Sequence, residues 1–267
     1  MDKSETYIQI IHLPSKEEPF LILNKSANLA SAPLYEGDKN SAFYFAAKAF
    51  PELLNIKGRK ECEHGLLHRL DTRTEGLLLI ASSQEFYDFI QEEQKSGGFI
   101  KKYRAICSID FNNAEKLEGY PPLRTGKKEI ENAFEKNNDL LLSSYFRNYG
   151  QNLKAVRPVT EDSGKAALKK LGKKTEYTTE VKILNLNLDE NKAICQCKIK
   201  AGYRHQVRCH LSWAGLPVKG DELYNFESHE KFMQGEKLEK LEFYACGLEF
   251  INPITNKKLS FEIPLNN

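Results

Sequence analysis

The sequence has no apolar run approaching the roughly 20 residues that a membrane-spanning helix requires. Its first residues, MDKSETYIQIIHLPSKEEP, lack the apolar core of a secretion signal. We therefore expect a cytoplasmic protein with no membrane partner. Apolar residues make up 40% and charged residues 28% of the 267 residues. This composition excludes a disordered chain and allows one large domain or two closely joined subdomains.

Three chemical signatures are also missing. The six cysteines include no CxxC pair and no His/Cys ligand spacing, so no metal is expected and the thiols should be reduced and mostly buried. Neither of the common glycine-rich phosphate loops occurs. The net charge of +2 neither requires nor excludes nucleic acid, because local patches matter more than the total.

The chain does contain many short apolar or alternating segments. They predict strands near residues 7–12, 20–24, 77–81, 99–107, 139–146, 176–186 and 192–201, a terminal hairpin over 241–263, and helices near 42–50, 84–95 and 205–214. Strands outnumber helices, and the regular alternation of a doubly wound fold is absent. The pattern predicts an α+β fold with a mixed, mainly antiparallel sheet.

The most distinctive stretch is residues 68–76, which read HRLDTRTEG and lead directly into the apolar run LLLIA. The apolar run predicts a buried strand. Asp71 then lies on a loop at the edge of a rigid element, where functional groups are often placed. On its own, the stretch is also typical of an ordinary loop with an exposed aspartate.

Two further positions suggest chemistry. Arg204 and Arg208 flank His205 at a predicted strand-to-helix junction, and such crowding of donors indicates an anionic partner. An arginine beside a carboxylate would keep it ionised, and Tyr103 adds a phenol. A carboxylate, a cation and a phenol lining one cleft could act on a glycosidic bond.

Basic clusters occur in the least regular part of the chain, residues 110–175. They are interleaved with aromatic residues, which is typical either of a solvated surface or of a surface facing RNA. The members are Arg124, Lys127 and Lys128; Arg147, Lys154 and Arg157; and Lys165, Lys169, Lys170, Lys173 and Lys174, with Tyr145, Phe146 and Tyr149 between them.

The stretch at 68–78 resembles the HRLDxxTSGLL signature of the RluA family of RNA pseudouridine synthases. Four other motifs of that family follow the same order in this chain. They are an early element with Asn24-Lys25 and Leu29-x-x-x-Pro33, a KxYxA strand at 101–105, a TxY strand at 175–177, and GxxHQVRxHL at 202–211 with GxPxxGDxxY at 215–224. One short motif would be weak evidence, whereas five in order form a specific pattern.

The resemblance implies a catalytic role for three residues. Asp71 corresponds to the family's catalytic aspartate, Tyr103 to the tyrosine that packs against the target uracil, and Arg208 to the arginine that pairs with the aspartate. Arg69 corresponds to the residue that enters the RNA stack where the uridine leaves. The other residues expected to contact RNA are His68, Arg73, Lys101, Arg204, His205 and Gln206.

The resemblance also implies the general properties of the protein. The fold would be a bent, mainly antiparallel sheet with two subdomains flanking an RNA-binding cleft. Residues 1–267 would form a single catalytic domain without a separate N-terminal RNA-binding domain. We expect a monomer that acts on ribosomal or transfer RNA and needs no cofactor and no metal.

The sequence departs from the family pattern at several positions. Glu75 replaces a serine or threonine, Tyr203 displaces the arginine of the third motif, and Ser26 and Asn28 replace a proline and a glycine. These changes leave two alternatives open. One is a catalytically silent relative that only binds RNA, and the other is a nucleosidase or glycosidase that uses Asp71 with Glu75.

Overall fold

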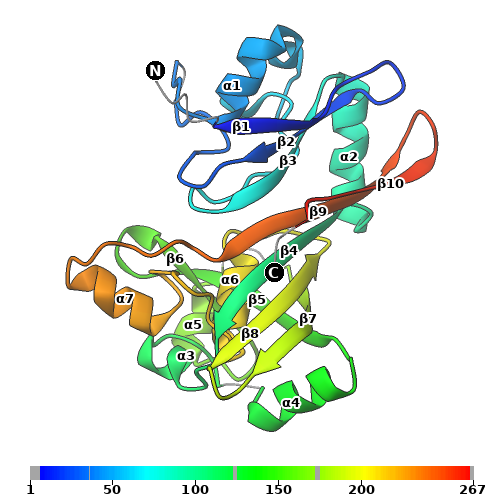
Figure 1. Ribbon diagram of the computed structural model, residues 1–267. Coiled ribbons are helices and arrows are strands. Elements are labelled where there is room, and N and C mark those ends of the chain that lie inside the picture. Colours follow the sequence, from blue (N-terminus) through cyan, green and yellow to red (C-terminus); the bar gives the residue numbers. More distant parts are fainter. Residues whose placement is uncertain (1–6, 36, 123–124, 172–174, 265–267) are drawn as a thin grey trace. The chain divides into compact units, whose positions relative to one another are not determined.

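The computed structural model of the protein describes residues 7–35, 37–122, 125–171 and 175–264 (Figure 1). The chain divides into two compact units. The first unit comprises residues 1–101 and 244–267, and the second comprises residues 102–243. Assignment of the whole chain to one catalytic domain stays a prediction.

The first unit is a sheet in the order β1, β2, β3, β9, β10. Neighbouring strands are antiparallel except β3 and β9, which are parallel. The strands are β1 (Ile8–His12), β2 (Phe20–Lys25), β3 (Glu75–Ala81), β9 (Phe243–Asn252) and β10 (Lys257–Glu262). The helices are α1 (Ala42–Ala49) and α2 (Gln84–Ser96), with short 3-10 turns at Pro51–Asn55 and Glu61–Glu63.

Local sequence signals fix the two helices of this unit. The Ser41 and Ser83 side chains cap the helix starts by accepting bonds from Tyr44 N at 3.1 Å and Phe86 N at 3.3 Å. Gly97 ends α2 at a φ of 85°, a left-handed conformation that favours glycine. These caps confirm the helix starts and the stop that the sequence predicted.

The core of the first unit lies between α2 and the sheet. Phe86 and Ile90 of α2 pack against Leu77 and Leu79 of β3 and Phe250 of β9, and all five side chains are buried. Because β3 is buried along nearly its whole length, the loop before it is attached to a rigid element.

The second unit contains a sheet in the order β4, β8, β7, β5, β6. The pairs β8–β7, β7–β5 and β5–β6 are antiparallel. The strands are β4 (Ile100–Ser108), β5 (Leu140–Tyr149), β6 (Ala155–Val159), β7 (Tyr177–Asn187) and β8 (Lys192–Ile199). The helices are α3 (Asn113–Lys116), α4 (Lys127–Glu135), α5 (Lys165–Lys169), α6 (Gln206–Trp213) and α7 (Phe226–Met233), with a 3-10 turn at Gln151–Leu153.

Every residue of α6 is buried, including its polar ones. His210 is an example: its Nε2 lies 2.9 Å from Ser144 Oγ and its Nδ1 lies 2.8 Å from Thr179 Oγ1. Burial lowers the pKa of His210 to about 3, so the ring is neutral near pH 7. The helix therefore depends on satisfied side-chain hydrogen bonds as well as on apolar packing.

The expected fold class is confirmed, since the protein is α+β with mostly antiparallel strand pairs. All six cysteines are free thiols and five are buried, as predicted. The sequence missed β6, α3, α4, α5 and α7. The strand β6 escaped notice because it contains Arg157 and Pro158, and a proline is tolerated there since β6 is an edge strand.

Two members of one basic cluster fit neither of the two alternatives left open, a solvated surface or a surface facing RNA. Arg147 and Arg157 are buried, so they do not form an RNA-facing surface. Arg157 donates to the carbonyls of Leu117, Val156 and Glu118, and its guanidinium lies over the ring of Tyr120 at 4.3 Å. The other two clusters include Arg124, Lys173 and Lys174, which lie outside the described residues.

Two absences can be stated for the described part of the chain. None of its helices combines the length and the apolar character needed to cross a membrane. Over the same residues, no group of three or more His, Cys, Asp or Glu side chains could hold a metal ion.

Candidate active site

Asp71 lies on the loop that leads into β3, and hydrogen bonds fix the loop on both sides of it. Ser31 Oγ donates to Leu70 O at 2.8 Å and accepts from Leu70 N at 2.9 Å. Thr74 N donates to Asp71 O at 3.0 Å, which closes a turn. The aspartate itself is partly buried. The backbone that carries it is therefore held in one conformation.

A buried lysine lies beneath this loop. Lys25 ends β2 and is fully buried, and its Nζ donates to Ser26 O at 3.0 Å, Leu29 O at 2.8 Å and Thr72 O at 3.2 Å. Burial lowers the pKa of Lys25 to about 8, and the negative charges of Asp71 and Glu75 oppose that lowering. By the same interaction, the ammonium group stabilises the ionised form of Asp71.

Sequence reasoning noted Lys25 only as part of a motif and missed this role. The available signal was a lysine at the end of a strand that begins with four apolar residues, since a charged residue is rarely buried unless partners surround it. The charge of Glu75 acts on Lys25 as well.

Gly76 sets the direction in which the signature enters the sheet. It pairs with Ala245 of the parallel strand β9 and has a φ of 134°. A Cβ atom at this position would lie 2.2 Å from Ala245 O, which no side chain could accommodate. Glycine is therefore required directly after Glu75.

The arginines and the lysine of the first unit that were predicted to contact RNA differ in their accessibility. Arg69 is 59% exposed, and its Nη1 lies 3.1 Å from Glu63 Oε1. Arg73 is partly buried. Lys101 is buried with its Nζ 4.3 Å from the centre of the Phe99 ring, and burial lowers its pKa to about 8.

His68 is turned toward the protein. Its Nε2 accepts from Leu79 N at 3.1 Å, and burial and the charge of Lys101 lower its pKa to about 3. A neutral ring that accepts at Nε2 carries its proton on Nδ1. His68 therefore supports β3 at Leu79, and this geometry does not favour it as a cationic contact to RNA.

Tyr103 belongs to the second unit and lies on β4. The side chains of this strand alternate between buried and partly buried, and Lys101, Tyr103 and Ala105 share the buried face, as predicted. The Tyr103 ring stacks on Phe243 with ring centres 5.1 Å apart and planes 3° apart. This stack fixes the orientation of the ring.

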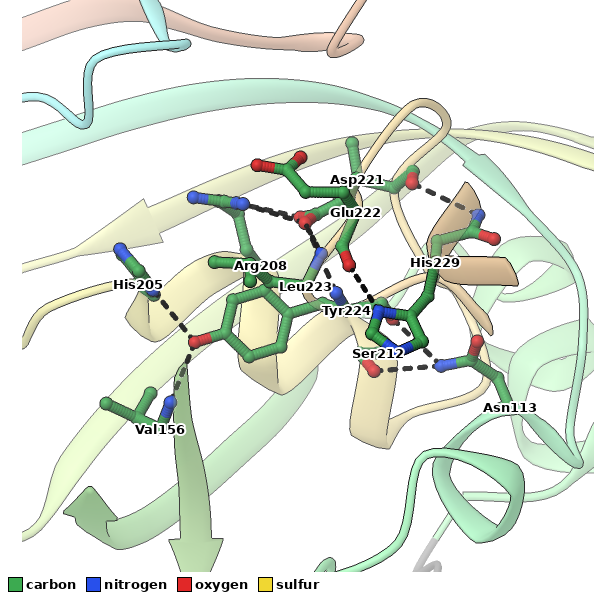
Figure 2. Close-up of polar contacts among 12 residues, drawn as sticks. Asn113, Val156, His205, Arg208, Ser212, Asp221, Glu222, Leu223, Tyr224 and His229 are labelled. Carbon is green, nitrogen blue, oxygen red and sulfur yellow. Dashed lines mark hydrogen bonds and ion pairs between the residues drawn. The ribbon is translucent and has the colours of Figure 1, made fainter. Parts of the chain in front are cut away.

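Arg208 of α6 forms a two-pronged ion pair (Figure 2). Its Nε donates to Asp221 Oδ2 and its Nη2 donates to Asp221 Oδ1, both at 2.7 Å. Both side chains are buried, and the Arg208 Cζ lies 5.2 Å from the centre of the Tyr224 ring. Asp221 Oδ1 also accepts from Leu223 N at 3.0 Å and Tyr224 N at 3.2 Å.

Sequence reasoning missed Asp221 as a partner of Arg208, although the GxPxxGDxxY segment contains it. The signal was the combination of a buried helix and an aspartate followed by a turn. The two hydrogen bonds to Asp221 use Nε and Nη2 of Arg208, and Nη1 takes no part in them. Pairing of Arg208 with Asp71 stays a prediction.

The start of α6 holds the remaining predicted residues. Gln206 is buried, its Oε1 accepts from Tyr203 N at 2.9 Å, and its Nε2 donates to Thr178 O at 3.0 Å and Thr179 Oγ1 at 3.2 Å. These bonds use the whole amide, so the structure favours a supporting role for Gln206 over direct RNA contact.

Arg204 is exposed, and its Nη2 donates to Asn148 Oδ1 of β5, to Leu153 O of the loop that follows, and to Ala155 O of β6. Tyr203 stacks on Phe146 with ring centres 4.9 Å apart. Tyr203, which displaces the family arginine, is thus part of an aromatic cluster. The neighbouring Arg204 anchors a loop through the protein's own oxygens.

An α+β fold that carries these motifs on its loops, strands and helix starts is that of the pseudouridine synthases. The chain belongs to the RNA pseudouridylate synthase family, whose model matches residues 19–213.

Curated relatives agree with this assignment. An uncharacterized RNA pseudouridine synthase of Mycoplasma pneumoniae is 25% identical over 254 residues, which cover 94% of this chain and 65% of that protein. Ribosomal large subunit pseudouridine synthase D of Zymomonas mobilis is 25% identical over 252 residues, which cover 92% of this chain and 67% of that protein. The chain thus spans about two thirds of the length of these relatives.

Solved structures support the fold. Human RNA pseudouridylate synthase domain containing 1 has a TM-score of 0.62 at 17% identity and covers 99% of this chain and 86% of its own. Human RNA pseudouridylate synthase domain containing 4 has a TM-score of 0.56 at 17% identity and covers 96% of this chain and 88% of its own.

Proposed function

We propose that the protein isomerises a specific uridine of ribosomal or transfer RNA to pseudouridine. Family membership gives the reaction class, and relatives are named for large-subunit ribosomal RNA. The observation that carries the proposal is the surroundings of Asp71. A backbone held at Leu70 and Thr74 positions it, and the buried Lys25 stabilises its charge. A rigid, ionised carboxylate is suited to attack or to remove a proton.

The reaction exchanges one bond for another. The N1–C1′ bond breaks, the uracil turns, and C5 bonds to C1′; N1 gains a proton and C5 releases one. Asp71 acts at the sugar in one of two ways. It attacks C1′, and the bond so formed breaks when C5 bonds to C1′, or it removes the 2′ proton and returns it to C2′ after C5 has bonded to C1′. Since product and substrate contain the same atoms, the reaction consumes no second reagent, and the proposal includes no cofactor and no metal.

The target base must first leave the RNA stack, which costs a few kcal/mol. Arg69 is the proposed residue that fills the vacated space. Its exposed guanidinium is held by Glu63 at 3.1 Å, a contact that is easily exchanged because exposed ion pairs contribute little. Arg73, Arg204 and His205 are proposed to contact RNA. His68, Lys101 and Gln206 are proposed to support the segments that carry these contacts.

Tyr103 and Arg208 are proposed to act in the same reaction. Tyr103 supports the freed uracil and accepts or relays the C5 proton, and Arg208 keeps the aspartate ionised and aimed. We predict that Tyr103→Phe slows pseudouridine formation with a much smaller loss of RNA affinity. Single-turnover kinetics beside a binding titration measure both quantities, and an unchanged rate would remove Tyr103 from the chemical step.

One assay separates this function from the alternatives. The protein is incubated with ribosomal and transfer RNA transcripts that carry tritium at C5 of uridine. Tritium release without free uracil indicates isomerisation. Free uracil would indicate hydrolysis by Asp71 and Glu75, and neither product would indicate a protein that only binds RNA. Cytoplasmic location and a monomeric state are part of the proposal.

A further inference from the structure

The loop of residues 32–40 starts and ends at fixed points of the first unit. Ser31, which precedes it, holds Leu70 through two hydrogen bonds, one to the carbonyl oxygen at 2.8 Å and one from the amide at 2.9 Å. Ala30 forms a β-bridge with Ser41, the residue that follows the loop. The loop is therefore anchored at both ends, and its first anchor is the segment that carries the proposed catalytic aspartate.

Asp38 holds the tip of this loop. Its Oδ2 accepts from Leu34 N and its Oδ1 accepts from Asn40 N, both at 2.9 Å, and Asp38 N donates to Tyr35 O at 3.1 Å. The hydrogen bonds from Leu34 N and Asn40 N lower the pKa of Asp38, so its carboxylate is ionised near neutral pH. The loop's own backbone thus occupies this carboxylate and fixes the chain at Leu34 and Tyr35.

The side chains at this tip are large, apolar and exposed. Leu34 is 81% exposed and Tyr35 is 67% exposed. Within the described part of the chain, neither side chain forms a hydrogen bond, a ring stack or a cation–π contact. Two adjacent apolar side chains that a fixed backbone holds in water favour a partner that covers them.

The position of the loop indicates which partner this is. Ser31 precedes Tyr35 by four residues, so their Cα atoms are at most roughly 14 Å apart. Ser31 Oγ in turn lies 2.9 Å from the amide nitrogen of Leu70, the residue before Asp71. Successive bases along a nucleic-acid strand are about 3.4 Å apart when stacked. An RNA strand that places a uridine at Asp71 can therefore bring a base a few positions away to the Tyr35 ring.

An unpaired base suits this tip by its chemistry. Every base has an apolar face that stacks on an aromatic side chain, whatever the sequence. Extruding the target uridine interrupts the stack and leaves neighbouring bases without a partner. Such a contact needs no positive charge, and the carboxylate of Asp38 does not oppose it, because Asp38 is bonded to the loop's own backbone.

We propose that Tyr35, with Leu34 beside it, is a stacking site for an unpaired base of the RNA, a few nucleotides from the target uridine. The ligand is the face of a nucleobase, and the site sets how tightly the RNA is held rather than how the bond is exchanged. The proposal rests on the proposed function, since it assigns Tyr35 to the same RNA. A second copy of this chain is the other occupant that the experiments address.

Two substitutions of Tyr35 separate the ring from the hydroxyl group. Tyr35→Ala should raise KM for tritium release from ribosomal and transfer RNA about five- to tenfold and leave kcat within about twofold, because stacking stabilises bound substrate and transition state equally. Tyr35→Phe keeps the ring and should stay within about twofold of the wild type in both constants. Leu13→Ala is the control, since Leu13 is a 58% exposed apolar residue of the same unit. If Tyr35→Ala behaves like Leu13→Ala, the proposal is wrong.

Stacking can be observed directly without turnover. The probes are short oligouridylates in which one uridine, at each position in turn, is replaced with 2-aminopurine, whose fluorescence falls when it stacks. Binding to the wild type and to Tyr35→Phe should quench the probe at one or two positions, and Tyr35→Ala should lose this quenching. Equal fluorescence with the wild type and Tyr35→Ala at every position would overturn the proposal. Quenching without tritium release would instead refute the proposed function and leave the stacking site in place.

Sedimentation equilibrium of the full chain tests the other occupant. The wild type and Tyr35→Ala should have the same mass in solution, because the proposed partner of the ring is RNA. If Tyr35→Ala dissociates an oligomer and leaves the affinity for RNA unchanged, Leu34 and Tyr35 form an interface between copies of this chain and the proposal is wrong.

Discussion

Two buried cations, Lys25 in the first unit and Arg208 in the second, are held in opposite ways. In the first unit, the Lys25 ammonium is surrounded by neutral backbone carbonyls, and the carboxylate it acts on, Asp71, lies on a partly buried loop. In the second unit, the guanidinium of Arg208 has a fully buried counter-ion, Asp221, at 2.7 Å.

This difference separates two tasks. Carbonyl dipoles satisfy the hydrogen bonds of Lys25 without cancelling its charge, so that charge remains able to act on Asp71. The ion pair with Asp221 offsets part of the charge of Arg208 and fixes the guanidinium in place. The first arrangement tunes the proposed catalytic group, and the second orders the start of α6 and the turn at Asp221.

The largest expected effect comes from breaking the ion pair in the second unit. Arg208→Met leaves the buried Asp221 carboxylate without its cation, and we expect a loss of about 3–5 kcal/mol of unfolding free energy. Urea denaturation measures this loss. The control is the double variant Arg208→Met with Asp221→Leu, which removes both charges and should recover much of the stability. A double variant as unstable as the single one would contradict the ion-pair account.

A smaller effect is expected from Lys25→Met in the first unit. The variant leaves three carbonyls without their donor but also removes a buried charge, so a net loss of about 1–3 kcal/mol is expected at pH 7. Tritium release should fall more than stability does, because Asp71 loses a stabilising charge. If activity falls only in proportion to the folded fraction, Lys25 does not act on Asp71.

The pH dependence of the unfolding free energy tests the burial of Lys25 separately. The folded pKa of Lys25 is about 8 and its ordinary value is 10.5. Between these values the unfolded chain binds more protons than the folded one, so the contribution of Lys25 to stability rises with pH. Wild-type stability should therefore rise relative to Lys25→Met from pH 8 to pH 10, and subtracting the two curves cancels the other groups. If the difference in unfolding free energy between the wild type and Lys25→Met does not change between pH 8 and pH 10, Lys25 does not have a lowered pKa in the folded protein.

The smallest effect on stability is expected at the surface of the first unit. Arg69→Ala removes an exposed contact to Glu63 and should change the unfolding free energy by less than about 1 kcal/mol. If Arg69 replaces the extruded uridine, product formation on structured RNA should still fall strongly, while a short single-stranded RNA should be affected less. Equal losses on both RNAs would exclude the wedge role.

Much of the architecture could be predicted because its signals are local. The caps at Ser41 and Ser83, the glycine after α2 and the apolar run of β3 each give their element from a few neighbouring residues. The motif order likewise gave the family and pointed to Asp71.

What could not be predicted depends on residues far apart in the sequence. Lys25 and Thr72 are joined across 47 positions, and Arg157 reaches Leu117 across 40. Composition marks both cations as surface residues, and only the tertiary fold supplies the carbonyls that allow their burial. The same holds for Asp221, whose role depends on where α6 lies.

The central claim is that Asp71 performs the chemistry, and Asp71→Asn tests it most directly. The substitution keeps the size of the side chain and the backbone bonds at Leu70 and Thr74, but removes the charge. Tritium release from C5-labelled ribosomal and transfer RNA should be abolished while RNA binding persists. Turnover near that of the wild type would contradict the account.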